Sequence, residues 1–124
     1  MFNYAGEPWK TQRAIRRILH TEYMNEPGGL SGNDDAGQMS AWYIFAAMGF
    51  YPVCPGTPYY ILAAPTFPSL TIRLENGKEF TLKAENLSDG NCYVQSARLN
   101  GKPYTRNYIT HQEILNGGVL EFVM

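Results

Sequence analysis

The spacing of apolar residues changes near Pro52, and this change constrains the fold more than any other feature of the sequence. Before it, apolar residues recur every three or four positions, which is typical of helices. After it, short alternating runs are separated by turn sequences, which is typical of antiparallel strands. The sequence therefore predicts an α+β fold, with a helical hairpin over 1–52 and an antiparallel, β-sandwich-like unit of six or seven short strands over 53–124.

Two helices are expected in the first part. The first begins at Pro8, a residue that suits a first helical turn, and carries an apolar stripe of Ile15, Ile18, Leu19 and Tyr23. The second runs from Asp34 or Asp35 to Met48 and is apolar nearly all round, so it needs neighbours on more than one side. Either both helices pack on the sheet of a small domain, or they form the C-terminal end of a larger helical assembly. The second alternative is favoured.

Turn sequences divide the second part into strands. Asn76-Gly77 separates the alternating runs 70–74 and 80–84, and Asn100-Gly101 is a second hairpin signal. Residues 108–115 are expected to hold a short pair of strands. Gly117-Gly118 precedes a last strand.

Composition narrows the classes of function. With 124 residues and a net charge of −1, the chain suits one globular domain, and its few clustered cations argue against a nucleic-acid partner. The sequence shows neither a bilayer-spanning apolar stretch nor a signal peptide. Cys54 and Cys92 fit no metal-binding spacing, so free thiols are expected and a disulfide is left open.

The stretch GLSGNDDAGQMSAWYIF, residues 29–45, places Asp34 and Asp35 side by side where the second helix begins. One capping oxygen is enough for a helix start, and Ser31 or Asn33 can supply it. The helix dipole and the exposed N–H groups keep a nearby carboxylate ionised. Two interpretations follow: a capped helix with solvated acids, or a loop carboxylate that activates water or binds a cation.

Three stretches of the sequence are similar to one enzyme family. NYAGEPWKTQRAIRRI (3–18), GLSGNDDAGQMSAWYIFAAMGFYPVCPG (29–56) and LNGKPYTRNYITHQEILNGGVLEFVM (99–124) resemble the C-terminal part of the calcium-dependent exo-α-mannosidases of glycoside hydrolase family 92. The resemblance implies that the two helices end an (α/α)6 barrel. It also implies removal of terminal mannose, often α-1,2-linked, with inversion and with Ca²⁺.

The resemblance also suggests site residues. In GNDDAG it implies the general base, with Asp35 the first choice and Asp34 the second. Asn33 and Gln38 are expected to contact substrate or calcium. Trp9 is expected either to line the same end of the barrel or to pack between helix and barrel. The calcium ligands are not assigned.

The general acid is not expected in this chain. Inversion needs two carboxyl groups about 6.5–9.5 Å apart with water between them, which neighbouring Asp34 and Asp35 do not suit. Glu7 is the only nearby alternative, and it reads as an ordinary first-turn carboxylate. The resemblance places the acid upstream, so the chain alone is expected to be inactive.

Two other functions stay open. Exposed tyrosines, among Tyr59, Tyr60 and Tyr93, would suit a non-catalytic carbohydrate-binding module, and the chain could also be a structural or interaction domain. His20 and His111 lack metal-binding spacing, so surface or core positions are expected. The expected partners are a mannose-containing glycan, the rest of the barrel, and a second copy through the helix faces. The family resemblance implies a secreted or periplasmic protein.

Overall fold

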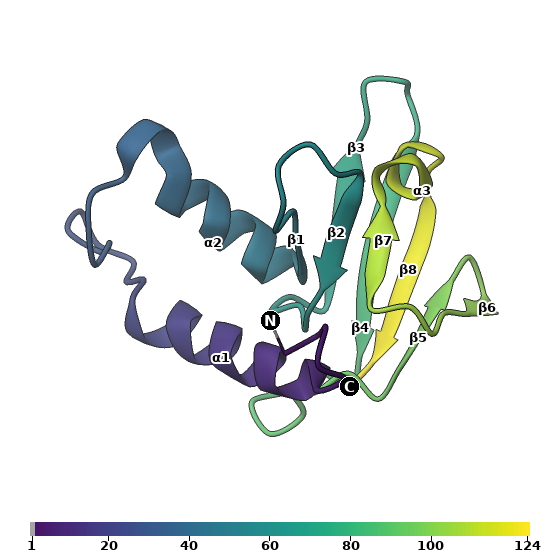
Figure 1. The fold of residues 1–124 in the computed structure, drawn as a ribbon, viewed down its shortest axis with the longest axis horizontal. Coiled ribbons are helices and arrows are strands. Elements are labelled where there is room, and N and C mark those ends of the chain that lie inside the picture. Colours follow the sequence, from purple (N-terminus) through teal and green to yellow (C-terminus); the bar gives the residue numbers. More distant parts are fainter. Residues whose placement is uncertain (1) are drawn as a thin grey trace.

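A computed structural model of the protein describes residues 2–124 and shows the two long helices on one side of two packed sheets (Figure 1). Helices α1 (Pro8–Thr21) and α2 (Gln38–Met48) form a hairpin, and a short 3-10 turn (Asp35–Gly37) precedes α2. A third helix, α3 (His111–Leu115), lies within the β part. The predicted α+β class is confirmed.

The strands form two sheets. The smaller sheet is antiparallel, in the order β1 (Phe50–Tyr51), β2 (Tyr59–Leu62) and β7 (Tyr108–Thr110). The larger sheet has the order β3 (Ser69–Arg73), β4 (Glu79–Glu85), β8 (Gly118–Val123), β5 (Ser96–Leu99) and β6 (Lys102–Pro103). The two predicted hairpins are present: Asn76 and Gly77 join β3 to β4, and Asn100 and Gly101 join β5 to β6.

The larger sheet is not wholly antiparallel. Strand β8 pairs with β4 in parallel, with Phe80 opposite Gly118 and Glu85 opposite Val123, so the expectation of antiparallel pairing is wrong here. The chain reaches β8 only after a long excursion through β5, β6, β7 and α3. A connection of that length lets a strand return in the same direction as its neighbour.

Residues 108–115 also differ from the expected pair of strands. Only β7 forms, and the chain then enters α3. Thr110 caps this helix: its hydroxyl accepts a hydrogen bond from the Glu113 N–H, and the Glu113 carboxylate accepts one from the Thr110 N–H. This reciprocal capping box favours a helix over a second strand.

The core lies between the facing sides of the two sheets. Alternate residues of β4 and β8 point inward and are almost completely buried, as is Ile109 of β7; the set is Phe80, Leu82, Ile109, Leu120 and Phe122. Because side chains alternate along a strand, one face of the larger sheet is apolar and the other is polar. This packing gives the sandwich-like unit.

The helical hairpin is attached to the sheets through both polar and apolar contacts. The buried Gln12 of α1 accepts a hydrogen bond from the Val94 N–H (3.0 Å), and Phe45 and Met48 of α2 pack against the sheet core. The outer face of the hairpin is uncovered, and Ile44 is 57% exposed. The division of the chain at residue 52 stays a prediction.

None of the helices within residues 2–124 combines the length and the apolar character that a membrane crossing requires.

Candidate functional site

The loop that joins α1 to α2 is held closed by backbone contacts at its base. Tyr23 and Leu30 form an isolated β-bridge, and the Met24 N–H donates to the Gly29 carbonyl (2.8 Å). The Gly29 N–H donates in turn to the Glu26 carbonyl (2.9 Å). A methyl group on Gly29 would lie 1.9 Å from the Met24 carbonyl oxygen, so only glycine fits at this position.

The loop ends in a tight turn before α2. The Gly37 N–H donates to the Asp34 carbonyl (3.0 Å), and both Ala36 (φ 53°) and Gly37 (φ 77°) are left-handed. A left-handed alanine is uncommon because its Cβ crowds the backbone. Asp35 therefore lies at the start of a sharp turn.

Asp34 caps helix α2 from outside the helix. Its Oδ1 accepts hydrogen bonds from the N–H groups of Met39 (2.8 Å) and Ser40 (3.1 Å), and its Oδ2 accepts one from the Ser40 hydroxyl (2.6 Å). These donors, the Ser40 hydroxyl above all, hold the pKa of Asp34 below its usual range despite a small opposing effect of burial. Asp34, and not the possible caps Ser31 or Asn33, accepts these hydrogen bonds, because the left-handed turn brings Asp34 back over the helix start.

Asp35, in contrast, is exposed, and its carboxylate makes no hydrogen bond to any other residue of 2–124. The two neighbouring carboxylates thus differ in role. Asp34 accepts hydrogen bonds from the free N–H groups at the helix start, whereas the lone pairs of Asp35 stay available to accept a proton. A base must accept a proton, so the free carboxylate is the better suited of the two.

The other expected site residues lie in two places. Asn33 and Gln38 are exposed and flank the two aspartates. Trp9 lies in the first turn of α1, a helix of 14 residues and so about 21 Å long, and the aspartates follow the loop at its other end. Within this chain, Trp9 is not brought to the aspartates.

Trp9 and Glu7 have local partners instead. The Trp9 ring, 44% exposed, lies 5.4 Å from both the Lys10 ammonium and the Arg13 guanidinium. Glu7 pairs with Lys10 (2.5 Å). Glu7 lies at the start of α1, and the location of the general acid outside this chain stays a prediction.

The sequence analysis missed Tyr23 as part of this site. Its hydroxyl donates to the Met39 carbonyl (3.1 Å), and its ring stacks on Trp42 at 5.7 Å and 10°. Burial, followed by the charge of Asp34, raises the pKa of Tyr23, so the phenol stays a neutral donor. The sequence analysis placed Tyr23 on the apolar stripe of the first helix, but α1 ends at Thr21 and Tyr23 lies beyond it, in the bridge to Leu30. Tyr23 also lines an open cavity of about 620 Å³ between the loop and α2, together with Met24, Asn25, Leu30, Ser40, Tyr43 and Ile44.

The histidines and cysteines lie apart from the two aspartates in the sequence, and the structure shows the surroundings of each. The His111 Nδ1 and the Tyr60 hydroxyl are 3.0 Å apart, and His20 is exposed on α1. Cys54 and Cys92 are free thiols. Within residues 2–124, no three His, Cys, Asp or Glu side chains are grouped closely enough to hold a metal ion.

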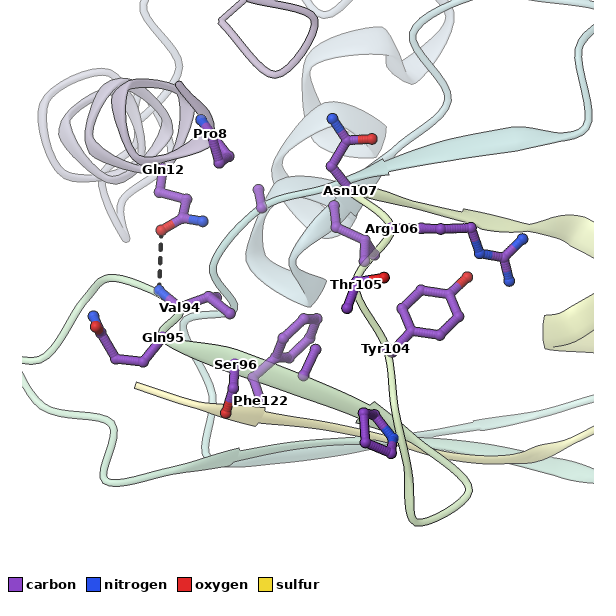
Figure 2. A pocket seen from close by; sticks show the side chains of 14 residues that line it. Pro8, Gln12, Val94, Gln95, Ser96, Tyr104, Thr105, Arg106, Asn107 and Phe122 are labelled. Carbon is purple, nitrogen blue, oxygen red and sulfur yellow. Dashed lines mark hydrogen bonds between the residues drawn. The ribbon is translucent and has the colours of Figure 1, made fainter. Parts of the chain in front are cut away.

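A second cavity, of about 410 Å³, lies between the start of α1 and the β part (Figure 2). Gln12 crosses one end of it to reach the Val94 N–H, and Phe122 forms part of its floor. The labelled side chains of Tyr104 and Arg106 point away from the middle of this cavity. Its walls are mainly apolar, so it offers few groups that could orient a polar ligand.

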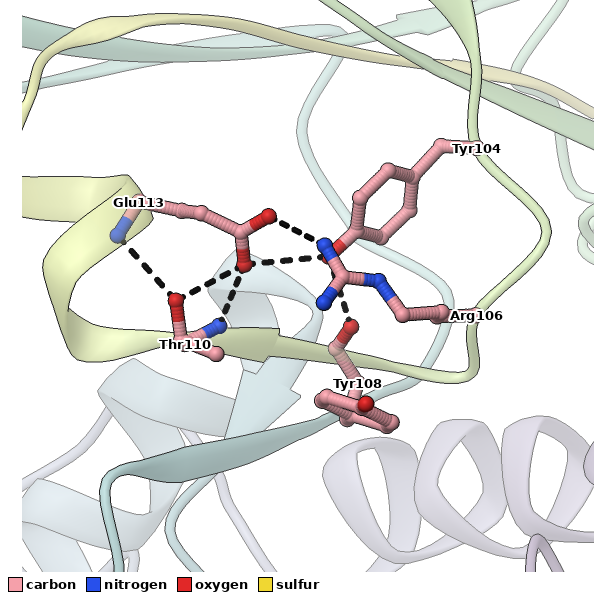
Figure 3. A network of polar contacts seen from close by, with 5 residues as sticks. All are labelled: Tyr104, Arg106, Tyr108, Thr110 and Glu113. Carbon is pink, nitrogen blue, oxygen red and sulfur yellow. Dashed lines mark hydrogen bonds and ion pairs between the residues drawn. The ribbon is translucent and has the colours of Figure 1, made fainter.

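The most connected polar cluster of the β part surrounds Glu113 (Figure 3). Tyr104, Arg106 and Thr110 all donate to its carboxylate. Burial and the charge of Glu113 raise the pKa of Tyr104 to about 12. This network joins the β6–β7 connection to α3 and has a structural role.

The comparisons with known proteins identify the family. The model of the glycosyl hydrolase family 92 catalytic domain matches residues 1–124. The chain belongs to this family. A curated relative from Arthroderma benhamiae, called an uncharacterized secreted glycosidase, is 36% identical over 127 residues, which cover 100% of this chain and 16% of the relative.

Two solved structures from Bacteroides thetaiotaomicron agree with this assignment. A family GH92 α-mannosidase matches with a TM-score of 0.94 and 47% identity, covering 99% of this chain and 17% of its own. A family GH92 inverting mannosidase matches with a TM-score of 0.87 and 45% identity, covering 94% and 16%. The chain thus spans about a sixth of the length of these relatives.

Proposed function

We propose that this chain is the C-terminal part of an inverting α-mannosidase and that Asp35 is the general base. The observation that carries the proposal is the difference between the two aspartates. Asp34 is hydrogen-bonded at both carboxylate oxygens, whereas Asp35 is exposed and free to accept a proton. Membership of the glycosyl hydrolase family supports hydrolysis of a glycoside as the reaction.

In this mechanism, Asp35 removes a proton from the water that attacks the anomeric carbon. An acid from outside this chain protonates the leaving oxygen on the opposite face of the sugar. The substrate is a glycan with terminal mannose, α-1,2-linked, and Asn33 and Gln38 contact it beside the base. A solved relative labelled as an inverting mannosidase supports this stereochemistry.

Paired variants of a complete enzyme carrying this segment test the assignment. Asp35→Asn keeps the size of the side chain but cannot accept the proton, so kcat should fall about 10²–10⁴-fold. Asp34→Asn is the matched variant, and it should lower activity less. An equal, small loss in both would reject the catalytic role. A collapse of kcat in Asp34→Asn alone would make Asp34 the base.

The 124-residue chain alone should not release mannose from α-1,2-mannobiose in the presence of Ca²⁺. It lacks an acid beside the base, and positioned acid and base together supply much of the acceleration. Calcium-dependent turnover by the pure chain would contradict this proposal.

The proposal includes Ca²⁺, but residues 2–124 do not fit a calcium site on their own. They contain no cluster of three acidic or histidine side chains, and both oxygens of Asp34 already accept hydrogen bonds. The ligands then come mainly from the rest of the enzyme. Chelation should abolish activity of the complete enzyme without changing the melting temperature of the 124-residue chain. A rise of that temperature on adding Ca²⁺ would show that the chain holds the ion itself.

The rest of the barrel is the main proposed partner. It would cover the outer face of the hairpin, where Ile18, Tyr43 and Ile44 are exposed. A secreted or periplasmic location is proposed on the family resemblance, and the curated relative's description as a secreted glycosidase supports it.

A further inference from the structure

One of the three donors that hold the Asp34 carboxylate belongs to a peptide unit that has hydrogen-bond partners at both ends. The N–H of the Met39–Ser40 peptide donates to Asp34 Oδ1 (3.1 Å). The carbonyl of the same peptide, Met39 O, accepts the Tyr23 hydroxyl (3.1 Å). A donor at the carbonyl polarises the peptide and strengthens the hydrogen bond that its N–H makes.

We propose that Tyr23 is a positioning residue for the general base and acts through this peptide. Its hydroxyl holds the Met39–Ser40 peptide, the peptide holds Asp34, and Asp34 fixes the turn that carries Asp35. This inference rests on the function proposed above and extends it to a residue on the other side of the loop.

The surroundings of Tyr23 suit such a role. The ring is held by stacking on Trp42 and by a tilted contact with Tyr43 at 5.1 Å. Its backbone is tied down by the bridge to Leu30. The hydroxyl is therefore presented to Met39 by a ring that packs on α2 and by a backbone that is tied to the base of the loop.

The turn is the part that needs this support. The Asp34 carbonyl accepts the Gly37 N–H, and Ala36 between them is left-handed. A left-handed alanine persists only where the surrounding contacts enforce it. Weakening the hold on Asp34 should let the turn relax and move Asp35 away from its position.

The chain offers a closely matched pair of variants. Tyr23→Phe keeps the stacked ring and removes only the hydroxyl. Tyr43→Phe removes a hydroxyl from the same cavity, and among the described residues that hydroxyl makes no hydrogen bond to Met39 or Asp34. In a complete enzyme carrying this segment, Tyr23→Phe should lower kcat on the order of tenfold, the effect of one hydrogen bond, with KM changed less than about twofold. Tyr43→Phe should keep wild-type kcat.

A second measurement on the 124-residue chain needs no activity. Carboxyl NMR should show the Asp34 side chain titrating at higher pH in Tyr23→Phe than in wild type or Tyr43→Phe, because its peptide donor is weakened. Equal loss of kcat in both tyrosine variants, or an unchanged Asp34 titration, would overturn the inference.

These outcomes separate the inference from the function on which it rests. Wild-type kcat in Tyr23→Phe, with Asp35→Asn inactive, would reject the role of Tyr23 and leave Asp35 as the base. An active Asp35→Asn enzyme would reject the proposed function. Any loss of kcat in Tyr23→Phe would then act through a different group, which also overturns the inference.

Discussion

Gly29 is the position at which a single methyl group should most directly disturb the loop of the two aspartates. A Cβ there would lie 1.9 Å from the Met24 carbonyl oxygen and 2.9 Å from that of Glu26, against a practical limit of 3.0 Å. Both atoms belong to the backbone, so neither can rotate away. The loop must therefore move by about 1 Å and give up the contact between Met24 and Gly29.

The cost can be estimated from this displacement. Overpacking of this kind destabilises a protein by about 1–3 kcal/mol. In a complete enzyme, a misplacement of about 1 Å at a catalytic group lowers kcat by about 10²-fold. Gly29→Ala should therefore reduce both the free energy of unfolding and kcat.

Gly28→Ala is the control, one residue away. A Cβ on Gly28 meets nothing within 4 Å, so this variant should keep its activity and be as stable as wild type or slightly more so. Urea unfolding and hydrogen exchange of the Met24 amide measure the effect on the chain, and steady-state kinetics measure it on the enzyme. Wild-type stability and Met24 protection in Gly29→Ala would refute the reasoning.

Three further predictions concern the rest of the chain. Gln12→Met should lower the free energy of unfolding by about 1–3 kcal/mol, because it leaves a backbone N–H unpaired, whereas the exposed control Gln95→Met should stay within about 0.5 kcal/mol in urea unfolding. Burial raises the pKa of Glu113, but the hydrogen bonds from Thr110 and the Arg106 guanidinium outweigh it and leave that pKa below its usual range. The stability that this carboxylate contributes is thus fully present above its unfolded-state pKa and is lost as pH falls through its lower folded-state pKa. The midpoint of urea unfolding should therefore fall less on acidification in Glu113→Gln than in wild type. Light scattering should show dimers or larger species of the 124-residue chain, and Ile44→Lys should return it to a monomer; a wild-type monomer at high concentration would contradict this expectation.

The parts of the fold that local signals determine could be predicted from the sequence. Pro8 begins α1, and the two Asn-Gly pairs form the turns of β3–β4 and β5–β6. Each of these features depends on residues within a few positions. The α+β class follows from the same local periodicity.

The parts that depend on distant residues could not be predicted. The parallel pairing of β4 with β8 joins segments far apart in the chain, and no local pattern specifies it. The capping box of α3 is an exception, because Thr110 and Glu113 have the local spacing that predicts a helix start.

The candidate site shows the same limit on a smaller scale. The sequence places two carboxylates and two other capping candidates at one helix start, but the cap is chosen by the backbone of Ala36 and Gly37. Both residues must be left-handed for Asp34 to reach Met39 and Ser40. Propensity disfavours that conformation for alanine, so the sequence alone favours a different cap.

Because the two aspartates are adjacent in the sequence, Asp34 can fix the position of Asp35. A capping carboxylate is a poor base, because donors already occupy its lone pairs and hold it ionised. It is a good anchor for the same reason, since it ties the turn to the rigid first turn of α2. With Asp35 only one residue from that anchor, little backbone lies between the fixed point and the free carboxylate. Because catalysis by a base needs a defined position as well as free lone pairs, the pair supplies both requirements from consecutive residues.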